Sequence, residues 1–505
     1  MEEKKEIKKE SREKELTESE KSVWETLNDH EKESVFMFAE PYRLWCESFR
    51  TERERTKYFV EAATSKYDFK VIEIGSDADL SGKYPPGTRL LYVNKKKSFS
   101  LVVVGKESPV THGFRLIGSH LDTPRLDLKL APLKESSDAK VAVMRTHYYG
   151  GVKLYQWATV PLHLVGTVVL EDGSCVDVDV GKNPGDPSFV IPDLLPHLMK
   201  DVQSDRKARD VMKGEEMHVL VGGLPYAPAD TEKEEEAKEK IKTNVLDILF
   251  KKYGIKEADF KTAELSFVSG ISPRYVGFDK AFIAAAGQDD GVCSYCGVEA
   301  MFQMCRDGVI PERTCVMVGH DKEEIGSNGP TGAQSRFFTF VLHDLVARIT
   351  GKESAMASNA AFTKSFLLSA DVTAAVNPIF TSPHDPKLAA KAGYGVCVEK
   401  YTGHGGKYGT NDATAEAMGE LKAIFKKHKV PYVVCTLGKV GAGGGGTICK
   451  FTCEQLACDG IDVGTPVLAM HSPYELCHVC DIYATFKAYL AFYKGMREET
   501  EELEE

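Results

Sequence analysis

The spacing of apolar residues predicts that the chain opens with helices and continues into strands. Between residues 22 and 67 apolar positions recur at helical intervals, which predicts one or two amphipathic helices. Short apolar runs typical of strands follow at 71–75, 89–94, 100–106 and 114–122. Helices followed by strands in this way are typical of an α/β layer fold.

The pattern between residues 126 and 275 is typical of antiparallel β-structure instead. Alternating or β-branched runs occur at 141–149, 160–181 and 218–223, separated by Gly, Asp and Pro turns. A charged stretch then leads into a helical pattern at 244–254. This region is therefore predicted to be rich in strands.

After residue 276 strands and helices alternate again. Strands are predicted at 281–287, 314–320, 366–372, 394–400 and 431–438, and a last helix at 481–496. The polar motifs that follow the apolar runs lie before residue 125 or after residue 285. We therefore predict one α/β domain, residues 21–125 and 276–497, interrupted by an inserted β-rich domain at 126–275. Residues 1–20 are expected to form a charged extension and residues 498–505 an acidic tail.

Composition narrows the class of protein. The apolar share of 42% and the charged share of 28% are those of a globular protein, and the net charge of −11 disfavours nucleic acid as a partner. No apolar run reaches the roughly 18 residues of a membrane span, and the first residues resemble neither a secretory signal nor a transit peptide. We therefore expect a cytoplasmic protein.

The 13 cysteines are expected to be reduced thiols. Two Cys-x-x-Cys pairs, Cys293/Cys296 and Cys477/Cys480, leave a four-thiolate zinc site open as an alternative. Buried small residues one helical turn apart are the simpler interpretation of both pairs.

The first motif that carries chemistry is GSHLDTP, which ends the run at 114–122. His120 and Asp122 are two residues apart and share a face if the strand continues through them. A neutral imidazole binds zinc or cobalt well, and Asp122 would accept the other ring N–H and fix its tautomer. A capped strand end with a hydrogen-bonded histidine is the alternative.

Two further motifs contain adjacent carboxylates. GQDDG places Asp289 and Asp290 before a helical pattern, where one would serve as an N-cap but two favour a cation. HDKEEIGS places Glu323 and Glu324 directly after an apolar strand. Adjacent residues point in different directions, so one carboxylate can bind a metal while its neighbour takes a proton from the attacking water.

Asp371 in SADVT and His471 in AMHSPYE also follow apolar runs. Each residue taken alone is more typical of a helix cap or a satisfied structural histidine. Sites form at the carboxyl ends of strands in open α/β sheets, so five such coincidences together favour one shared site. The set predicts a hydrolase with two divalent cations, and zinc, cobalt or manganese would suit its ligands.

The five motifs, in this order and spacing, resemble the aspartyl aminopeptidase and vacuolar aminopeptidase I family of dinuclear metallopeptidases. The resemblance covers residues 35–495 and includes IPDLLPHLMK and KYTGHGGKYGTNDATAE, the latter in the form of the bacterial branch. It implies an α/β catalytic domain of the three-layer, phosphorylase/hydrolase-like type with an inserted domain that builds subunit interfaces. It also implies peptide substrates and a homo-oligomer, a tetrahedral dodecamer.

The resemblance also implies a role for each site residue. His120, Asp289 and Asp371 would bind one metal, and Asp289 would bridge to a second metal completed by Glu324 and His471. Glu323 would be the general base and Asp122 would orient His120. His404 and Lys407 in the glycine-rich segment are candidates for substrate contact.

Two departures from the family bear on substrate preference. Aspartyl-specific members carry a histidine where this chain has Ala374, and a further histidine in the stretch that reads YYGGVKLYQW here. Their absence predicts a broad or neutral preference rather than an acidic one. A carboxypeptidase or deacylase with a similar metal pair, a deblocking peptidase and a non-catalytic scaffold protein are the alternative functions.

Overall fold

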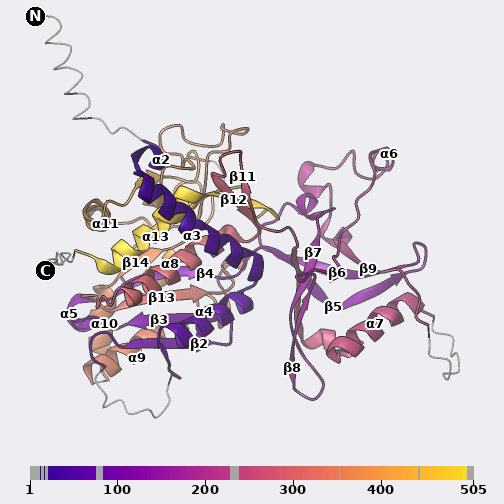
Figure 1. Ribbon diagram of the computed structural model, residues 1–505, viewed down its shortest axis with the longest axis horizontal. Coiled ribbons are helices and arrows are strands. Elements are labelled where there is room, and N and C mark those ends of the chain that lie inside the picture. The colour runs from indigo at the N-terminus through magenta and orange to yellow at the C-terminus, as the bar shows by residue number, and fades with distance from the viewer. Residues whose placement is uncertain are drawn as a thin grey trace, which may run out of the picture.

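The computed structural model of the 505-residue chain describes residues 12, 16, 21–74, 84–227, 238–351, 353–441 and 444–496. The expected acidic tail at 498–505 and, apart from residues 12 and 16, the expected extension at 1–20 lie outside the described residues. The described strands form sheets of nine, six and five strands, surrounded by helices (Figure 1). The prediction of a mixed α/β architecture is confirmed. No helix in this part of the chain is long and apolar enough to cross a membrane.

The nine-stranded sheet is the centre of the larger lobe. In order across the sheet its strands are β1 (Lys70–Val71), β2 (Arg89–Asn94), β3 (Ser98–Val103), β13 (Cys315–His320), β4 (Arg115–His120), β14 (Phe366–Ser369), β18 (Asp459–Gly464), β16 (Val396–Glu399) and β17 (Tyr432–Cys435). The neighbours β13, β4 and β14 are parallel, with His320 opposite His120 and Ser369 opposite Gly118. Their carboxyl ends therefore meet at one edge of the sheet.

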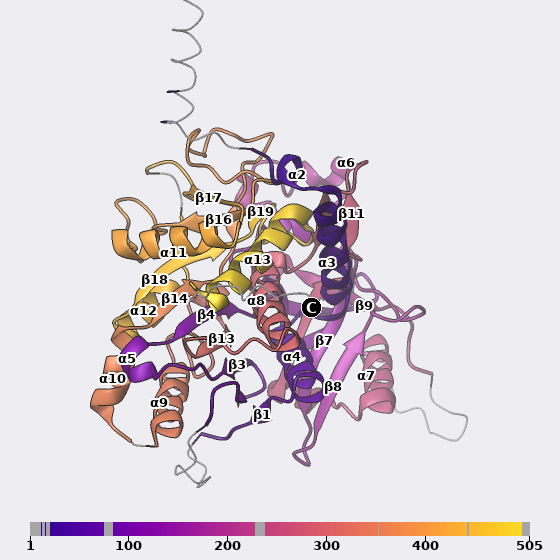
Figure 2. The ribbon, with the colours of Figure 1, turned by 60° about the vertical axis from the view of Figure 1, so that its left-hand side comes forward.

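Side chains that alternate along the strands enter two different apolar clusters, one on each face of this sheet. In β13, Met317 belongs to the first cluster, whereas Val316 and Val318 belong to the second. The first cluster is covered by α3 (Asp29–Ser48), α4 (Glu52–Lys66), α8 (Gln288–Arg306), α11 (Ala415–Lys427) and α13 (Val479–Lys494). The second is covered by α9 (Phe337–Thr350), α10 (Ala355–Thr363) and α12 (Cys449–Leu456) (Figure 2). The side chains on both faces of these strands are buried, which explains the near-continuous apolar runs in the sequence.

A separate five-stranded sheet supplies two of the motif loops. Its order is β11 (Arg274–Val276), β12 (Phe282–Ala285), β20 (Glu475–His478), β19 (Pro466–Leu468) and β15 (Thr373–Ala374). The GQDDG motif follows β12, and His471 lies in the turn between β19 and β20. The five motifs therefore come from two different sheets. Three motifs follow strands of the nine-stranded sheet, and two belong to this smaller one.

The six-stranded sheet lies in a second lobe, beside the rest of the chain (Figure 1). It consists of β8 (Cys175–Val180), β7 (Leu162–Val169), β10 (Ala263–Ser269), β5 (Arg125–Ser136), β6 (Val141–Tyr149) and β9 (His218–Gly222), all paired antiparallel. It has its own apolar core, to which α7 (Lys240–Tyr253) contributes Ile241, Val245 and Leu249. Three of the described α-helices have only four residues each: α2 (Val23–Thr26), α5 (Pro109–His112) and α6 (Pro196–Met199).

Charged side chains join the two lobes where the chain passes from β4 of the nine-stranded sheet to β5 of the six-stranded sheet. Arg125 on β5 lies 2.9 Å from the Glu52 carboxylate of α4, and Lys97 lies 3.2 Å from both Glu52 and Glu264 of β10. Both Glu52 and Arg125 are buried. Because a buried charge without its partner is costly, this cluster fixes the start of β5 against α4.

Candidate metal centre

Three site segments come from neighbouring strands of the nine-stranded sheet. His120 is the last residue of β4, and the Glu323–Glu324 turn follows β13 after a tight turn in which Lys322 has a φ of 68°. Asp371 comes two residues after β14. Because these strands are parallel neighbours, the three segments lie together at one edge of the sheet.

Asp289 and His471 reach the same place from the five-stranded sheet. Asp289 and Asp290 have non-helical backbone angles at the start of α8 and are joined by a cis peptide bond. His471 has a φ of 65°. The buried Glu475 carboxylate ties both segments together, because it accepts the backbone N–H of Asp289 at 3.2 Å and that of His471 at 2.7 Å.

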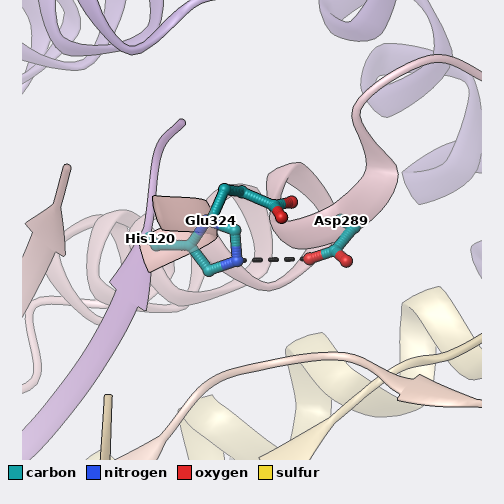
Figure 3. Close-up of side chains that lie close together, drawn as sticks. All are labelled: His120, Asp289 and Glu324. Carbon is teal, nitrogen blue, oxygen red and sulfur yellow. Dashed lines mark hydrogen bonds and ion pairs between the residues drawn. The ribbon is translucent and has the colours of Figure 1, made fainter. Parts of the chain in front are cut away.

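The Asp289 carboxylate lies between the two imidazoles. Its Oδ1 is 3.2 Å from Nε2 of His120, and its Oδ2 is 3.0 Å from Nε2 of His471. Figure 3 shows the ring of His120 pointing toward Asp289, with Glu324 next to both. A carboxylate with one oxygen toward each of two imidazoles has the arrangement of a ligand shared by two cations.

Other carboxylates complete the cluster. Ligand atoms of His120, Asp289 and Glu324 lie within 4.8 Å of one another, and so do those of His120, Asp290 and Asp371. Glu324 Oε2 is also 3.5 Å from Nε2 of His471. These are the only groups of three or more metal-compatible side chains found in the described part of the chain, so the cysteine pairs form no such group there.

The buried Asp122 makes hydrogen bonds to several residues of the site. Its backbone carbonyl is 3.0 Å from Nδ1 of His120 and its carboxylate 3.4 Å, which leaves Nε2 of that ring facing the cluster. The same carboxylate accepts the backbone N–H groups of Glu323 and Glu324 at 3.1 and 3.2 Å. One side chain thus holds both the imidazole and the turn with the paired glutamates.

The ionised form of the buried carboxylates in this cluster would be stabilised by positive charge. Burial raises the pKa of Glu323 to about 7 and, together with the Asp289 charge, raises the pKa of Glu324 well above its usual value. Burial also raises the pKa of Asp371 and of Asp290. Burial opposes ionisation of Asp289 too, but the two imidazoles beside it lower its pKa. A divalent cation relieves this repulsion by stabilising the ionised carboxylates.

A buried atom without a hydrogen-bond partner also favours a cation. Glu324 Oε1 is buried and accepts no hydrogen bond. A buried acceptor without a partner is rare in folded proteins and calls for an explanation such as an ion. The donor set of imidazoles and carboxylates fits zinc, cobalt or manganese.

The two residues predicted to contact substrate lie in the loop that follows β16. The Lys407 ammonium pairs with Asp412 at 2.6 Å and lies 4.0 Å from the ring centre of Tyr401, and His404 pairs with Tyr408 through the backbone. Their role therefore stays a prediction. The cysteines of both Cys-x-x-Cys pairs are free and buried, and Cys477 lies on β20 rather than on a helix.

Sequence reasoning missed several residues around the cluster. It gave no role to Glu475, although this residue ends the AMHSPYE motif. It also missed Tyr149 and Gly151, which contact Asp122 and His471 from the six-stranded sheet. The Tyr-Tyr-Gly-Gly run at the end of a predicted strand was the one available signal.

Comparison with known proteins decides the family. A family model described as "Aminopeptidase I zinc metalloprotease (M18)" matches residues 45–493. This chain belongs to the M18 family. A relative from Borrelia garinii subsp. bavariensis, named "Probable M18 family aminopeptidase 1", is 40% identical over 472 residues, which cover 93% of this chain and 98% of the relative. The chain is thus a metal-dependent aminopeptidase, a hydrolase that acts on peptides, and the resemblance seen in its motifs is confirmed.

Solved structures agree with this family. The M18 aminopeptidase of Thermotoga maritima superposes with a TM-score of 0.85 at 36% identity, covering 95% of this chain and all of that one. The mApe1 dodecamer of S. cerevisiae has a TM-score of 0.72 at 20% identity, with 90% of this chain and 96% of that chain covered, and shows the shared fold. The M18 fold therefore extends over nearly the whole chain.

The anchoring role of Glu475 in this M18 aminopeptidase is testable. Glu475→Gln replaces one acceptor oxygen by an amide that faces backbone N–H groups, and an unmet buried group costs about 1–3 kcal/mol. We expect the free energy of unfolding, measured by urea denaturation, to fall by about that amount.

The matched control is Glu454→Gln, since Glu454 is exposed on α12. Its effect should stay within about 0.5 kcal/mol. Equal stability of the two variants would contradict an anchoring role for Glu475.

Proposed function

We propose that this aminopeptidase releases N-terminal residues from peptides with two divalent cations per subunit and a glutamate base. The observation that carries the proposal is the Asp289 carboxylate, whose two oxygens face Nε2 of His120 and Nε2 of His471. A single metal site would need only one of those imidazoles at that carboxylate. The paired arrangement supports Asp289 as a carboxylate that two divalent cations would share, and those cations would supply the charge for hydrolysis.

The proposed ligand sets follow from proximity and donor type. His120 and Asp371 would hold one ion, Glu324 and His471 the other, and Asp289 both. The separation of 3.9 Å between Asp371 and Nε2 of His120, and of 3.5 Å between Glu324 and Nε2 of His471, supports this division. Asp290 lies near the first set and holds the backbone N–H of His120 at 3.2 Å, which supports an orienting role. Zinc is the proposed native ion, in keeping with the family description, and cobalt or manganese would fit the same donors.

Glu323 is the proposed general base. Bound divalent cations supply the charge that polarises the scissile carbonyl and lowers the pKa of the attacking water to about 7. Glu323 takes the proton from that water and passes it to the leaving amine. Burial raises the pKa of the Glu323 carboxyl, which makes its carboxylate a stronger base, and nearby cations would act in the opposite direction. Asp122 orients His120 and holds the turn that carries the base.

The architecture proposed for this chemistry has two domains. Residues 21–125 and 276–497 would form a phosphorylase/hydrolase-like catalytic domain of three layers, and residues 126–275 an inserted domain. Helices on both faces of the nine-stranded sheet and the separate core of the six-stranded sheet support this division. The inserted domain would build the interfaces of a tetrahedral dodecamer. The S. cerevisiae mApe1, which shares the fold, is a dodecamer, and this supports the proposed number of subunits.

Substrate preference and location belong to the same proposal. Ala374 and the lack of histidine in YYGGVKLYQW favour broad or neutral N-terminal residues, and His404 and Lys407 are proposed to contact the substrate. Thirteen free cysteines support a reducing compartment such as the cytoplasm.

The role of the base is tested by Glu323→Gln. Loss of a general base lowers kcat by about 10²–10⁴-fold, whereas the ligand set is unchanged. We expect the variant to keep the metal content of the wild type, measured by elemental analysis, and to lose most turnover of an aminoacyl reporter. Glu416→Gln, which changes an exposed glutamate on α11, is the control and should retain full activity. Near wild-type turnover by Glu323→Gln would remove this residue from the mechanism.

The exopeptidase reaction is tested with free and N-acetylated peptides. Chelation should abolish cleavage of free peptides, and re-addition of zinc, cobalt or manganese in turn should restore it. We expect N-acetylated peptides to remain intact with each metal, because a blocked amine cannot enter the proposed site. Release of the acetylated residue or of the acetyl group would favour a deblocking peptidase or deacylase instead.

A further inference from the structure

The end of β6 and the two residues that follow it reach the metal centre. Tyr149 is the last residue of β6, and Gly150 and Gly151 follow it. The Tyr149 hydroxyl donates to Oδ2 of Asp122 at 2.9 Å, and the Gly151 carbonyl lies 2.9 Å from Nδ1 of His471. One short segment therefore contacts both a proposed ligand and the residue that orients another.

The Tyr149 hydrogen bond is made to a carboxylate that also contacts His120 and the Glu323–Glu324 turn. It reaches the same Asp122 oxygen that accepts the backbone N–H of Glu324. The other Asp122 oxygen accepts the N–H of Glu323 and lies 3.4 Å from Nδ1 of His120. Rotation of this carboxylate would disturb the imidazole and the paired glutamates together. The buried hydroxyl group of Tyr149 restricts that rotation.

The Gly151 carbonyl selects the tautomer of His471. A carbonyl oxygen accepts a hydrogen bond only, so Nδ1 must carry the proton in the neutral ring. Nε2 is then left with a lone pair that faces Asp289 at 3.0 Å. The same logic holds at His120, where the Asp122 carbonyl lies 3.0 Å from Nδ1. Both imidazoles thereby present Nε2 to the cluster.

The glycine at position 150 is explained by close approach. Its φ is +79°, and an added Cβ would lie 3.1 Å from Oε2 and 3.3 Å from Cβ of Glu324. A side chain at this position would therefore push against a carboxylate of the cluster.

Tyr149 is itself held in place from the six-stranded sheet. Its ring lies 4.0 Å from the Arg125 guanidinium, which pairs with Glu52 at 2.9 Å and with Asp127 at 2.8 Å. The tyrosine is 9% exposed, whereas the neighbouring Tyr148 is 45% exposed. The contact with Arg125 makes the hydroxyl a fixed donor rather than a mobile one.

We propose that Tyr149–Gly151 is a positioning segment through which the six-stranded sheet sets the geometry of the metal centre. Tyr149 positions Asp122, and Gly151 sets the tautomer of His471. In this role the segment acts through Asp122 and His471. The inference rests on the proposed function of the cluster as a metal centre.

Tyr149→Phe in the full-length protein is the first test, with Tyr148→Phe as the control. Residues that orient metal ligands typically contribute about 10–100-fold to metal affinity or activity. We expect Tyr149→Phe to weaken zinc affinity by about 10-fold or more, to shift the visible absorption spectrum of the cobalt-loaded protein and to lower kcat more than it changes KM. Tyr148→Phe should match the wild type in all three.

Gly150→Ala gives a second, steric test. Gly173 has a similar φ of +83° with nothing within 4 Å of an added Cβ, so Gly173→Ala controls for backbone strain alone. We expect only Gly150→Ala to weaken zinc binding and to change the cobalt spectrum, while both variants keep the far-ultraviolet circular dichroism of the wild type.

The outcomes separate this inference from the proposed function. Wild-type zinc affinity and cobalt spectra in both Tyr149→Phe and Gly150→Ala would overturn the positioning segment and leave the metal centre intact. Failure of the wild-type protein to bind zinc or cobalt would overturn the proposed function itself.

Discussion

Burial of several carboxylates around two imidazoles is the constraint on which the rest of the structure depends. Asp289, Asp290, Glu324 and Asp371 lie close together where little water can screen them. Such groups repel one another when ionised, and burial already raises the pKa of most of them. Bound cations would favour the ionised forms of Asp290, Glu324 and Asp371. The metal requirement of this aminopeptidase therefore has a physical origin in its own side chains.

Two carboxylates that bind no metal in this account organise the others. Asp122 holds His120 and the Glu323–Glu324 turn from the edge of the nine-stranded sheet. Glu475 holds Asp289 and His471 from the five-stranded sheet. Each anchor thus serves one half of the cluster. The Asp289 carboxylate, with one oxygen toward each imidazole, joins the halves.

Much of the fold followed from local pattern, because the strands that carry the site are buried on both faces. Apolar runs ending at His120 and His320 predicted β4 and β13, and the motifs after them predicted where carboxylates would gather. The pattern could not show that Asp289 and His471 come from a second sheet, since strand length and hydrophobicity do not reveal which sheet a strand joins. The metal-binding roles themselves stay a prediction.

Contacts between sheets were beyond the reach of sequence pattern. Tyr149 contacts Asp122, which is 27 positions away in the sequence, and Gly151 contacts His471, which is 320 positions away. A tyrosine at a strand end and a backbone carbonyl carry no local signature of these partners. Glu475 is part of the AMHSPYE motif, but the motif does not show what this residue binds. Its carboxylate accepts three backbone N–H groups that only the folded chain brings to it.

Anomalous diffraction at the zinc edge from crystals of the zinc-loaded protein tests the central claim most directly. The account predicts two peaks per subunit, one on either side of the Asp289 carboxylate, within ligand distance of His120 and His471 respectively. A single peak, or peaks that do not share Asp289, would contradict it.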